Sequence, residues 1–401
     1  RNESDQTNTV VPKINLMPTY SEHLASKLPK VETNIFTVMS QLSAQYEAIN
    51  LSQGFPDFEV DKLLVDTVKK YLDKGVHQYA PMQGALQLRE QICKKVNTLY
   101  EASYHEEDEI TITAGATQAI FTAIAALIRE DDEVIIFTPA YDCYQPAIEL
   151  CGGKPIFIQM KAPHYEINWE EVKKVITQKT KMIIINSPHN PTGAILRKED
   201  LIELEKITTN SNILVLSDEV YEHLIYDDEK HYSVCSFPEL SNRSIAVFSF
   251  GKTFHVTGWK LGYILAPKEI MKEIRKVHQF NVFSCNHPVQ LAIAEYMQNE
   301  ENYLSLSAFY QQKRDLFKSI VEASRFENLS CNGTYFQLLN YSNISDLKDT
   351  EMAKKLVVEN KIASIPVSVF YHSPLDQHNL RFCFAKKTET LEKAGDILVK
   401  V

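Results

Sequence analysis

The sequence predicts an α/β protein built around a mainly parallel β-sheet. Between residues 110 and 265, short apolar runs typical of buried strands alternate with segments of helical spacing, as repeated strand–helix–strand units require. A glycine or a polar residue follows several of these runs, at Gly115, Asn190, Asp218 and Lys252. Because ligands of such sheets bind at the carboxyl ends of the strands, these positions predict a site at that edge.

Length and composition are those of a large globular enzyme. The chain of 401 residues is long enough for two domains, and its 44% hydrophobic and 23% charged residues are ordinary values. A net charge of -10 disfavours binding to nucleic acid or to an anionic membrane surface. We find no apolar run long enough to cross a bilayer and no secretion signal, so we expect a cytoplasmic protein.

The seven cysteines are scattered along the chain, and none of them forms a Cys-x-x-Cys pair. This pattern supports neither a disulfide framework nor a zinc site, and we expect no metal. Free thiols in a reducing cytosol are the simpler interpretation.

The N-terminal part of the chain predicts an arm, helices and one short strand. Residues 1–20 are polar and irregular. A strand within 49–58 breaks at Gly54, where the missing side chain lets a ligand approach the backbone; a plain turn is the alternative. Helical apolar spacing predicts helices over 36–46, 63–73 and 85–100.

The next two strands lead into candidate ligand-binding loops. Residues 110–120 predict a strand, a tight turn and a helix. The backbone amides of Ala116 and Thr117 open that helix, where the helix dipole favours an anion. The following strand, at 134–137, leads into a loop that contains Tyr141.

Two further strands end in polar residues. The strand at 182–185 leads into an Asn-Pro turn that contains Asn190, and the strand at 213–217 leads into Asp218 and Tyr221. The charge of Asp218 can keep a ring nitrogen protonated. A carboxylate that caps the next helix is the alternative for Asp218.

The strand at 244–248 ends in a turn of small residues that carries Lys252. A lysine at the end of a buried strand is costly unless it reacts or is paired, and a partly neutral amine can form a Schiff base with a carbonyl compound. Ser249 and Lys260 could bind an anion on the same ligand. Pyridoxal 5′-phosphate (PLP) carries both groups. The alternative is a surface loop with two solvated lysines.

The C-terminal part predicts further helices and strands, and one buried cation. Residues 269–299 have helical spacing with a break at 281–288, and 334–339 predict a strand. Arg381 lies between apolar residues in another predicted strand. A buried guanidinium needs an anion, and a carboxylate fits its fork. A structural ion pair is the alternative.

Several strings resemble the PLP-dependent class I aminotransferases. The string Ser-Phe-Gly-Lys-Thr-Phe-His-Val-Thr-Gly-Trp-Lys at 249–260 is most similar to the kynurenine and methionine aminotransferase branch, although many transaminases carry arginine where Lys260 stands. Asn-Ser-Pro-His-Asn-Pro-Thr-Gly at 186–193 also matches. The strings Asn-Leu-Ser-Gln-Gly-Phe-Pro-Asp-Phe at 50–58 and Gln-Tyr-Ala-Pro-Met at 78–82 resemble bacterial methionine aminotransferases. Nearly the whole chain takes part in the resemblance.

The resemblance implies a role for each matched residue. Lys252, Asp218 and Tyr221 are the implied catalytic residues, and His189 is interpreted as structural. The implied cofactor-binding residues are Ala116, Thr117, Tyr141, Asn190, Asp218, Tyr221, Ser249, Lys252, Lys260 and, from the neighbouring subunit, Tyr79. The implied substrate-binding residues are Gly54, Phe55, Asn190, Phe283 and Arg381.

The resemblance also implies an architecture. It is the fold type I PLP-transferase, with a mainly parallel seven-stranded sheet in a large domain and a smaller α+β domain. We expect an N-terminal arm over 1–28, a small domain built from 29–58 and 300–401, and a large PLP-binding domain over 59–299. A homodimer is implied, because Tyr79 has a role only across a subunit interface.

The implied reaction transfers the α-amino group of an amino acid to a 2-oxo acid by a ping-pong mechanism. Relatives specific for dicarboxylates carry an arginine in the stretch that corresponds to 280–287, and this sequence has none there. An uncharged side chain is therefore favoured: methionine first, with kynurenine, phenylalanine, tyrosine and histidine open. Three alternatives are a PLP-dependent cysteine-conjugate β-lyase or kynurenine–oxoglutarate transaminase, a non-catalytic PLP-binding regulator, and a protein that only resembles a PLP enzyme.

Overall fold

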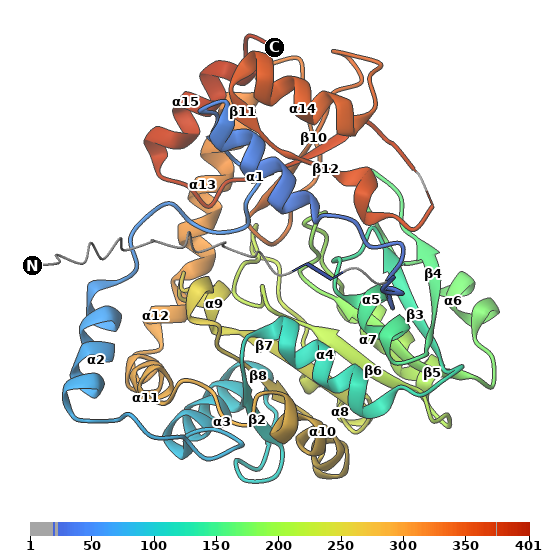
Figure 1. Cartoon of the computed structure of the whole chain (residues 1–401), viewed down its shortest axis with the longest axis vertical. Coiled ribbons are helices and arrows are strands. Elements are labelled where there is room, and N and C mark those ends of the chain that lie inside the picture. Colours follow the sequence, from blue (N-terminus) through green and yellow to red (C-terminus); the bar gives the residue numbers. More distant parts are fainter. Residues whose placement is uncertain (1–18, 21–22, 374) are drawn as a thin grey trace, which may run out of the picture.

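A seven-stranded sheet forms the centre of the computed structural model, which describes residues 19–20, 23–373 and 375–401 (Figure 1). Within that part of the chain the strand order is β2-β8-β7-β6-β5-β3-β4. Only β8 runs antiparallel to its neighbours, so the prediction of a mainly parallel seven-stranded sheet is confirmed. The strands are β2 (Ile110–Thr113), β3 (Glu133–Thr138), β4 (Lys154–Gln159), β5 (Thr180–Asn186), β6 (Leu214–Asp218), β7 (Ser244–Ser249) and β8 (Gly262–Leu265).

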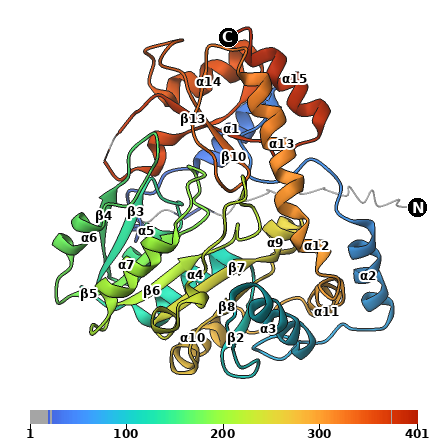
Figure 2. The same cartoon turned by 180° about the vertical axis from the view of Figure 1, so that it is seen from behind.

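Both faces of this sheet are buried, which is why its strands are apolar almost throughout. Alternate residues of one strand point to opposite faces. Accordingly, Ile183 and Ile185 of β5 belong to one core cluster, and Met182 and Ile184 to the other. The face with Met182 is covered by α4 (Ala116–Leu127), α5 (Tyr144–Leu150) and α10 (Lys268–Asn281); α3 (Leu86–Tyr100), α6 (Trp169–Val175), α7 (Lys198–Thr208) and α8 (Pro238–Ser241) contribute to the opposite core (Figures 1 and 2).

A second, smaller group of strands combines a strand near the N-terminal end of the chain with strands near its C-terminal end. An antiparallel sheet has the order β12-β13-β10-β9, and β1 pairs in parallel with β11. Figure 2 shows α1 among the C-terminal elements. The strands of this smaller group and the helices beside them are α1 (Ile35–Gln45), β1 (Ile49–Asn50), α13 (Leu306–Val321), β9 (Glu327–Asn328), β10 (Phe336–Asn340), α14 (Asp349–Asn360), β11 (Ile362–Ala363), β12 (Ile365–Pro366), η3 (Val367–Phe370), β13 (Asn379–Cys383) and α15 (Thr388–Leu398).

The remaining helical elements lie in the connections between strands. The helical stretch expected over 269–299 is divided into α10 and α11, as we predicted. None of the helices in the described ranges is long and apolar enough to cross a membrane. The connecting elements are α2 (Lys62–Asp73), η1 (Val234–Ser236), α9 (Phe250–Thr253), η2 (Thr257–Trp259), α11 (His287–Tyr296) and α12 (Glu301–Leu304).

Some expectations changed in detail. Lys252 lies in the short helix α9 rather than in a turn. The next helical segment after Asp218 begins only at Val234, which removes the helix-cap interpretation of Asp218. Most of the predicted arm over 1–28 lies outside the described residues, and the domain boundaries at 58 and 299 stay a prediction.

Candidate active site

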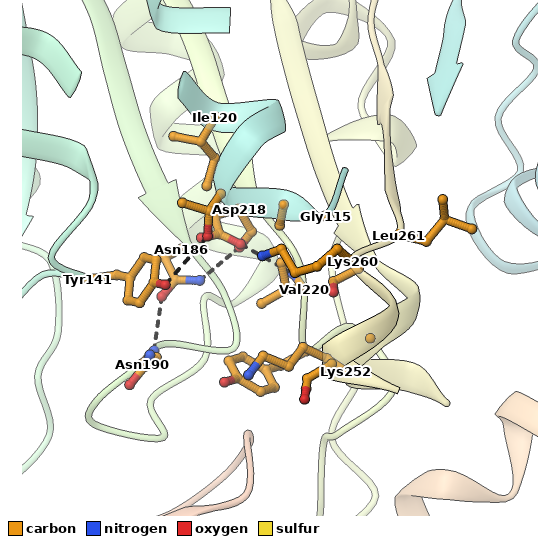
Figure 3. Close-up of a pocket in the computed structure, with 16 residues that line it drawn as sticks. Gly115, Ile120, Tyr141, Asn186, Asn190, Asp218, Val220, Lys252, Lys260 and Leu261 are labelled. Atoms are coloured by element: carbon orange, nitrogen blue, oxygen red, sulfur yellow. Dashed lines mark hydrogen bonds between the residues drawn. The ribbon is translucent and has the colours of Figure 1, made fainter. Parts of the chain in front are cut away.

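A cavity opens at the carboxyl ends of β5, β6 and β7, where the sheet order brings distant parts of the sequence together (Figure 3). The cavity collects most of the residues that the sequence singled out for a cofactor. Those that line it are Ala116, Thr117, Tyr141, Asn190, Asp218, Tyr221, Ser249, Lys252 and Lys260, together with Gly115.

One end of the cavity is built to hold an anion. Gly115 precedes α4 with φ +81° and ψ 172°, a conformation that is open almost only to glycine. Lys260 Nζ lies beside the start of the helix, 3.4 Å from the position that a Cβ on Gly115 would take. Backbone amides, the helix dipole and a lysine therefore converge here, together with Ser249.

Asp218 lies at the end of β6 and is only 4% exposed. Tyr144 donates a hydrogen bond of 2.5 Å to its carboxylate. Burial raises the pKa of Asp218 to about 6 in spite of this bond. A buried carboxylate gains most from a cationic N–H partner, and a protonated pyridine nitrogen is such a partner.

Lys252 projects from α9 toward the same cavity, as Figure 3 shows. Its Nζ donates to the Gly54 carbonyl oxygen and to the Tyr335 hydroxyl, each at 3.0 Å. Burial lowers the pKa of Lys252 to about 8. A pKa of that size leaves roughly a tenth of the amine neutral at pH 7, which is the form that attacks a carbonyl carbon. The interpretation as a solvated surface lysine does not fit these contacts.

Arg381 lies in β13, is 1% exposed and contacts Asn190, a residue that lines the cavity. Its Nη1 donates to Asn190 Oδ1 at 2.7 Å and its Nη2 to the Ser52 carbonyl oxygen at 3.0 Å. Its Nε has no hydrogen-bond partner among the described residues. The guanidinium carbon lies 3.8 Å from the centroid of the Phe336 ring.

These contacts describe a cation without an anion. Burial lowers the pKa of Arg381 to about 10, so the side chain is still charged at neutral pH. Across the described part of the chain, no carboxylate forms an ion pair with Arg381, in contrast to the structural alternative. A ligand carboxylate would supply the missing partner. Because Asn190 uses its oxygen on Arg381, its Nδ2 is left to donate elsewhere.

Three of the predicted residues lie away from the cavity. Tyr79 is 79% exposed and makes an edge-to-face contact with Phe283, with ring centroids 5.4 Å apart. Phe55 is also exposed, and its carbonyl oxygen accepts a hydrogen bond from Lys386 Nζ at 2.8 Å. Tyr79 and Phe283 share one exposed surface, which is compatible with a role in a neighbouring subunit.

Sequence reasoning missed two tyrosines that touch the central residues. Tyr144 bonds to Asp218, and Tyr335 bonds to Lys252. The string Gly-Thr-Tyr-Phe at 333–336, a glycine and an aromatic pair before an apolar strand, was the signal available for Tyr335. The structural interpretation of His189 is supported, because its ring is buried against Thr192 Oγ1 at 2.7 Å.

The residues present fit PLP. The anion end suits its phosphate, Asp218 suits its ring nitrogen, Tyr141 offers an aromatic face, and Lys252 suits its aldehyde. Residues 46–398 match the family model described as aminotransferase class I and II. The chain therefore belongs to the class I and II aminotransferases. It is a transaminase, and its cofactor is PLP.

Known aminotransferases are similar to this chain over almost their full length. The methionine aminotransferase of Escherichia coli is 46% identical over 374 residues, which cover 93% of this chain and 97% of that protein. Human kynurenine–oxoglutarate transaminase 3 is 32% identical over 405 residues, covering 93% of this chain and 89% of the relative. The crystal structure of Escherichia coli YbdL, described with a methionine aminotransferase function, has a TM-score of 0.92 at 45% identity and covers 96% of this chain and 100% of its own.

Proposed function

We propose that this aminotransferase takes its amino group from amino acids with uncharged side chains, methionine foremost. The observation that carries the proposal is Arg381, a buried guanidinium with an unpartnered Nε beside the cavity. It is fitted to one carboxylate, the α-carboxylate of the substrate. The stretch 280–287 holds no arginine for a second carboxylate. The 46% identity to a methionine aminotransferase supports the same choice.

The residues of the cavity divide the binding of PLP among them. Bound PLP supplies an electron sink for the substrate's Cα. Lys252 would hold its aldehyde carbon, and the α4 amides with Ser249 and Lys260 would hold its phosphate. Asp218 would keep the ring nitrogen protonated, Tyr141 would cover the ring face, and Asn190 with Tyr221 would donate to the phenolic oxygen.

Lys252 has a second task as general acid and base. Its amine lies at the cavity wall with a lowered pKa of about 8, so it can accept a proton from Cα and return it within one turnover. Arg381 orients the substrate by its carboxylate, which keeps the Cα proton facing Lys252.

In this proposal a backbone amide of the segment at Gly54 donates to the substrate's carboxylate. Ser52 and Gly54 already bond to Arg381 and Lys252 through their carbonyl oxygens, so this segment links the two catalytic cations. Closure of the small domain, which carries β1, β10 and β13, would exclude water from the cavity.

The assembly is part of the proposal. We infer a homodimer in which Tyr79 and Phe283 of one subunit complete the site of the other, because both are exposed in the single chain. Phe283 would then contribute an apolar wall for the substrate's side chain. We place the enzyme in the cytoplasm.

Selectivity among amino donors tests this proposal. A second carboxylate that enters the pocket without a cation loses its hydration uncompensated, at a cost of several kcal/mol. We expect kcat/KM for aspartate to be at least about 100-fold below that for methionine or phenylalanine. Steady-state assays with methionine, phenylalanine, kynurenine and aspartate at saturating oxo acid measure the ratio. Equal kcat/KM values for aspartate and methionine would contradict the proposed preference for uncharged side chains.

Kynurenine is the second candidate donor. The observation that favours it is the 32% identity to human kynurenine–oxoglutarate transaminase 3 over 93% of this chain. In the same assays, a kcat/KM for kynurenine above that for methionine would make kynurenine the preferred donor. Pyruvate release from a cysteine conjugate, measured in parallel, distinguishes β-lyase chemistry from amino transfer.

A further inference from the structure

Tyr335 places its hydroxyl at the reactive end of Lys252. It lies just before β10 and is fully buried, with 0% of its surface exposed. Its oxygen accepts a hydrogen bond from Lys252 Nζ at 3.0 Å, and its own hydroxyl proton is donated to the Gly54 carbonyl oxygen. Lys252 Nζ donates to the same Gly54 oxygen at 3.0 Å. The three groups form a closed triangle.

The Tyr335 ring cannot turn away from this triangle. Edge-to-face contacts hold it against Tyr221 and Phe336, with ring centroids 5.2 and 4.9 Å apart, and Tyr310 packs at 5.8 Å. Ring neighbours in a close-packed core restrict the orientation of a side chain. The hydroxyl is therefore fixed relative to the Lys252 amine.

The backbone before Tyr335 is strained. Thr334 adopts φ +65°, a left-handed conformation that a β-branched residue rarely occupies. Two contacts hold it there: its amide donates to the Leu224 carbonyl oxygen at 3.0 Å, and its carbonyl oxygen accepts from the Tyr226 hydroxyl. Strain of this kind persists where the surroundings over-determine a position, most often in functional sites. Here it sets the direction of the Tyr335 side chain.

The two hydrogen bonds of the Lys252 amine restrict the direction of its lone pair. A neutral lysine has two N–H bonds and one lone pair. The Gly54 oxygen and the Tyr335 oxygen take up both N–H bonds, and Tyr335 can only accept because its own proton points to Gly54. The lone pair is left with the one remaining tetrahedral direction, on an amine whose side chain lines the cavity.

We propose that Tyr335 is a positioning residue for transamination, which holds the free amine of Lys252 so that its lone pair faces the substrate's Cα during proton transfer. The proposal rests on the assignment of Lys252 as the catalytic lysine. Tyr335 takes no proton itself; it orients the group that does. Its loss should therefore slow the chemical step more than it weakens substrate binding.

Tyr335→Phe removes the hydroxyl and keeps the ring. Tyr310→Phe is the matched control, because Tyr310 belongs to the same aromatic cluster but bonds to His255 Nδ1 at 2.8 Å instead of Lys252. For the holoenzyme we expect kcat with methionine to fall at least about 10-fold in Tyr335→Phe, with KM within about threefold of wild type. Tyr310→Phe should leave both constants within about threefold.

A second readout examines the amine directly. In the full-length chain freed of PLP, trace acetic anhydride followed by peptide mass spectrometry measures the fraction of neutral Lys252 at each pH. Tyr335 bonds more strongly to the ammonium than to the amine, so its loss should move the labelling midpoint down by about one pH unit. Recovery of activity on adding PLP back shows that the chain stayed folded.

Three results would overturn the proposal: a kcat for Tyr335→Phe within about threefold of wild type, an unmoved labelling midpoint, or an equal loss in Tyr310→Phe. An equal loss would mean that packing of the aromatic cluster matters, and not the hydroxyl at Lys252. Borohydride reduction of the wild-type holoenzyme identifies the cofactor lysine independently. A wrong assignment of Lys252 is thereby distinguished from a passive Tyr335.

Discussion

Lys252, in α9, and Lys260, just after η2, have different surroundings. Lys252 is half-buried and burial lowers its pKa to about 8, whereas Lys260 is exposed in a left-handed conformation with φ +52°. A buried amine is poised to react, and a solvated ammonium is suited to pair with an anion. The difference in burial, rather than residue type, separates their proposed roles.

Replacement of Lys252 tests this separation. Lys252→Ala should lower turnover with methionine at least about 1,000-fold, because both the bond to the cofactor and the proton transfer are lost. Lys260→Ala is the control, and it should mainly weaken PLP binding. Borohydride reduction followed by peptide mapping should find the cofactor on Lys252. A cofactor fixed on Lys260 would reverse the assignment.

Asp218 makes folding of the PLP-free chain depend on pH. Its folded-state pKa of about 6 lies above the ordinary value of 3.8. A carboxyl whose pKa is raised by folding contributes its full stability below pH 4 and loses it as the pH rises to about 6. The loss corresponds to about 3 kcal/mol at neutral pH.

Asp218→Asn should abolish that pH dependence. Relative to wild type, the free energy of unfolding of the PLP-free variant should rise by about 3 kcal/mol between pH 4 and pH 7. Urea unfolding at several pH values measures the difference. Asp66→Asn is the control, because it removes a surface carboxylate that pairs with Lys62. Its free energy of unfolding relative to wild type should change little between pH 4 and pH 7. If the free energy of unfolding of Asp218→Asn relative to wild type stayed the same from pH 4 to pH 7, folding would not raise the pKa of Asp218.

At the scale of elements, the anion end depends on how α4 begins. Gly115 has a backbone conformation that other residues adopt only at a cost of about 1–3 kcal/mol. Gly115→Ala should therefore weaken PLP binding about 10-fold, as measured by fluorescence titration of the PLP-free protein. Gly258→Ala is the matched control, because an added Cβ there meets no atom within 4 Å. Equal affinities of the two variants would show that the turn is not part of the phosphate site.

Sequence patterns predicted the elements that carry their own local signal. β5, β6 and β7 are continuous apolar runs, and the residues after them could be assigned to the sheet edge from position alone. β8 was not assigned on its own, because Gly262–Leu265 is short and follows a loop. Its place between β2 and β7 depends on pairing with distant residues.

The same limit applies to the site. Lys252, Asp218 and Asn190 follow recognisable strings, so they could be predicted with their neighbours. Tyr335 meets Lys252 only through folding, since it lies just before a strand of the smaller sheet and the string around it does not indicate a partner. Contacts of this kind are set by tertiary packing, which a sequence pattern does not encode.

At the scale of the whole molecule, the exposed pair Tyr79 and Phe283 predicts that each site needs two chains. Co-expression of Tyr79→Ala with Lys252→Ala should then restore activity that neither variant has alone. Half of the randomly formed dimers are hybrids with one complete site, so about a quarter of wild-type activity is expected. A mixture of Lys252→Ala with Asp218→Asn is the control, because both residues act within one chain and no complete site forms. An inactive first mixture would contradict the shared site.

The cavity for PLP draws its lining residues from 115–261, whereas the guanidinium that awaits the carboxylate belongs to β13. Proteins are synthesised from the N-terminus, and folding can begin before synthesis ends. Every residue that lines the cavity thus leaves the ribosome before Arg381 does. The residues proposed to hold the ring and phosphate of the cofactor are therefore made before the guanidinium proposed to bind the substrate's α-carboxylate.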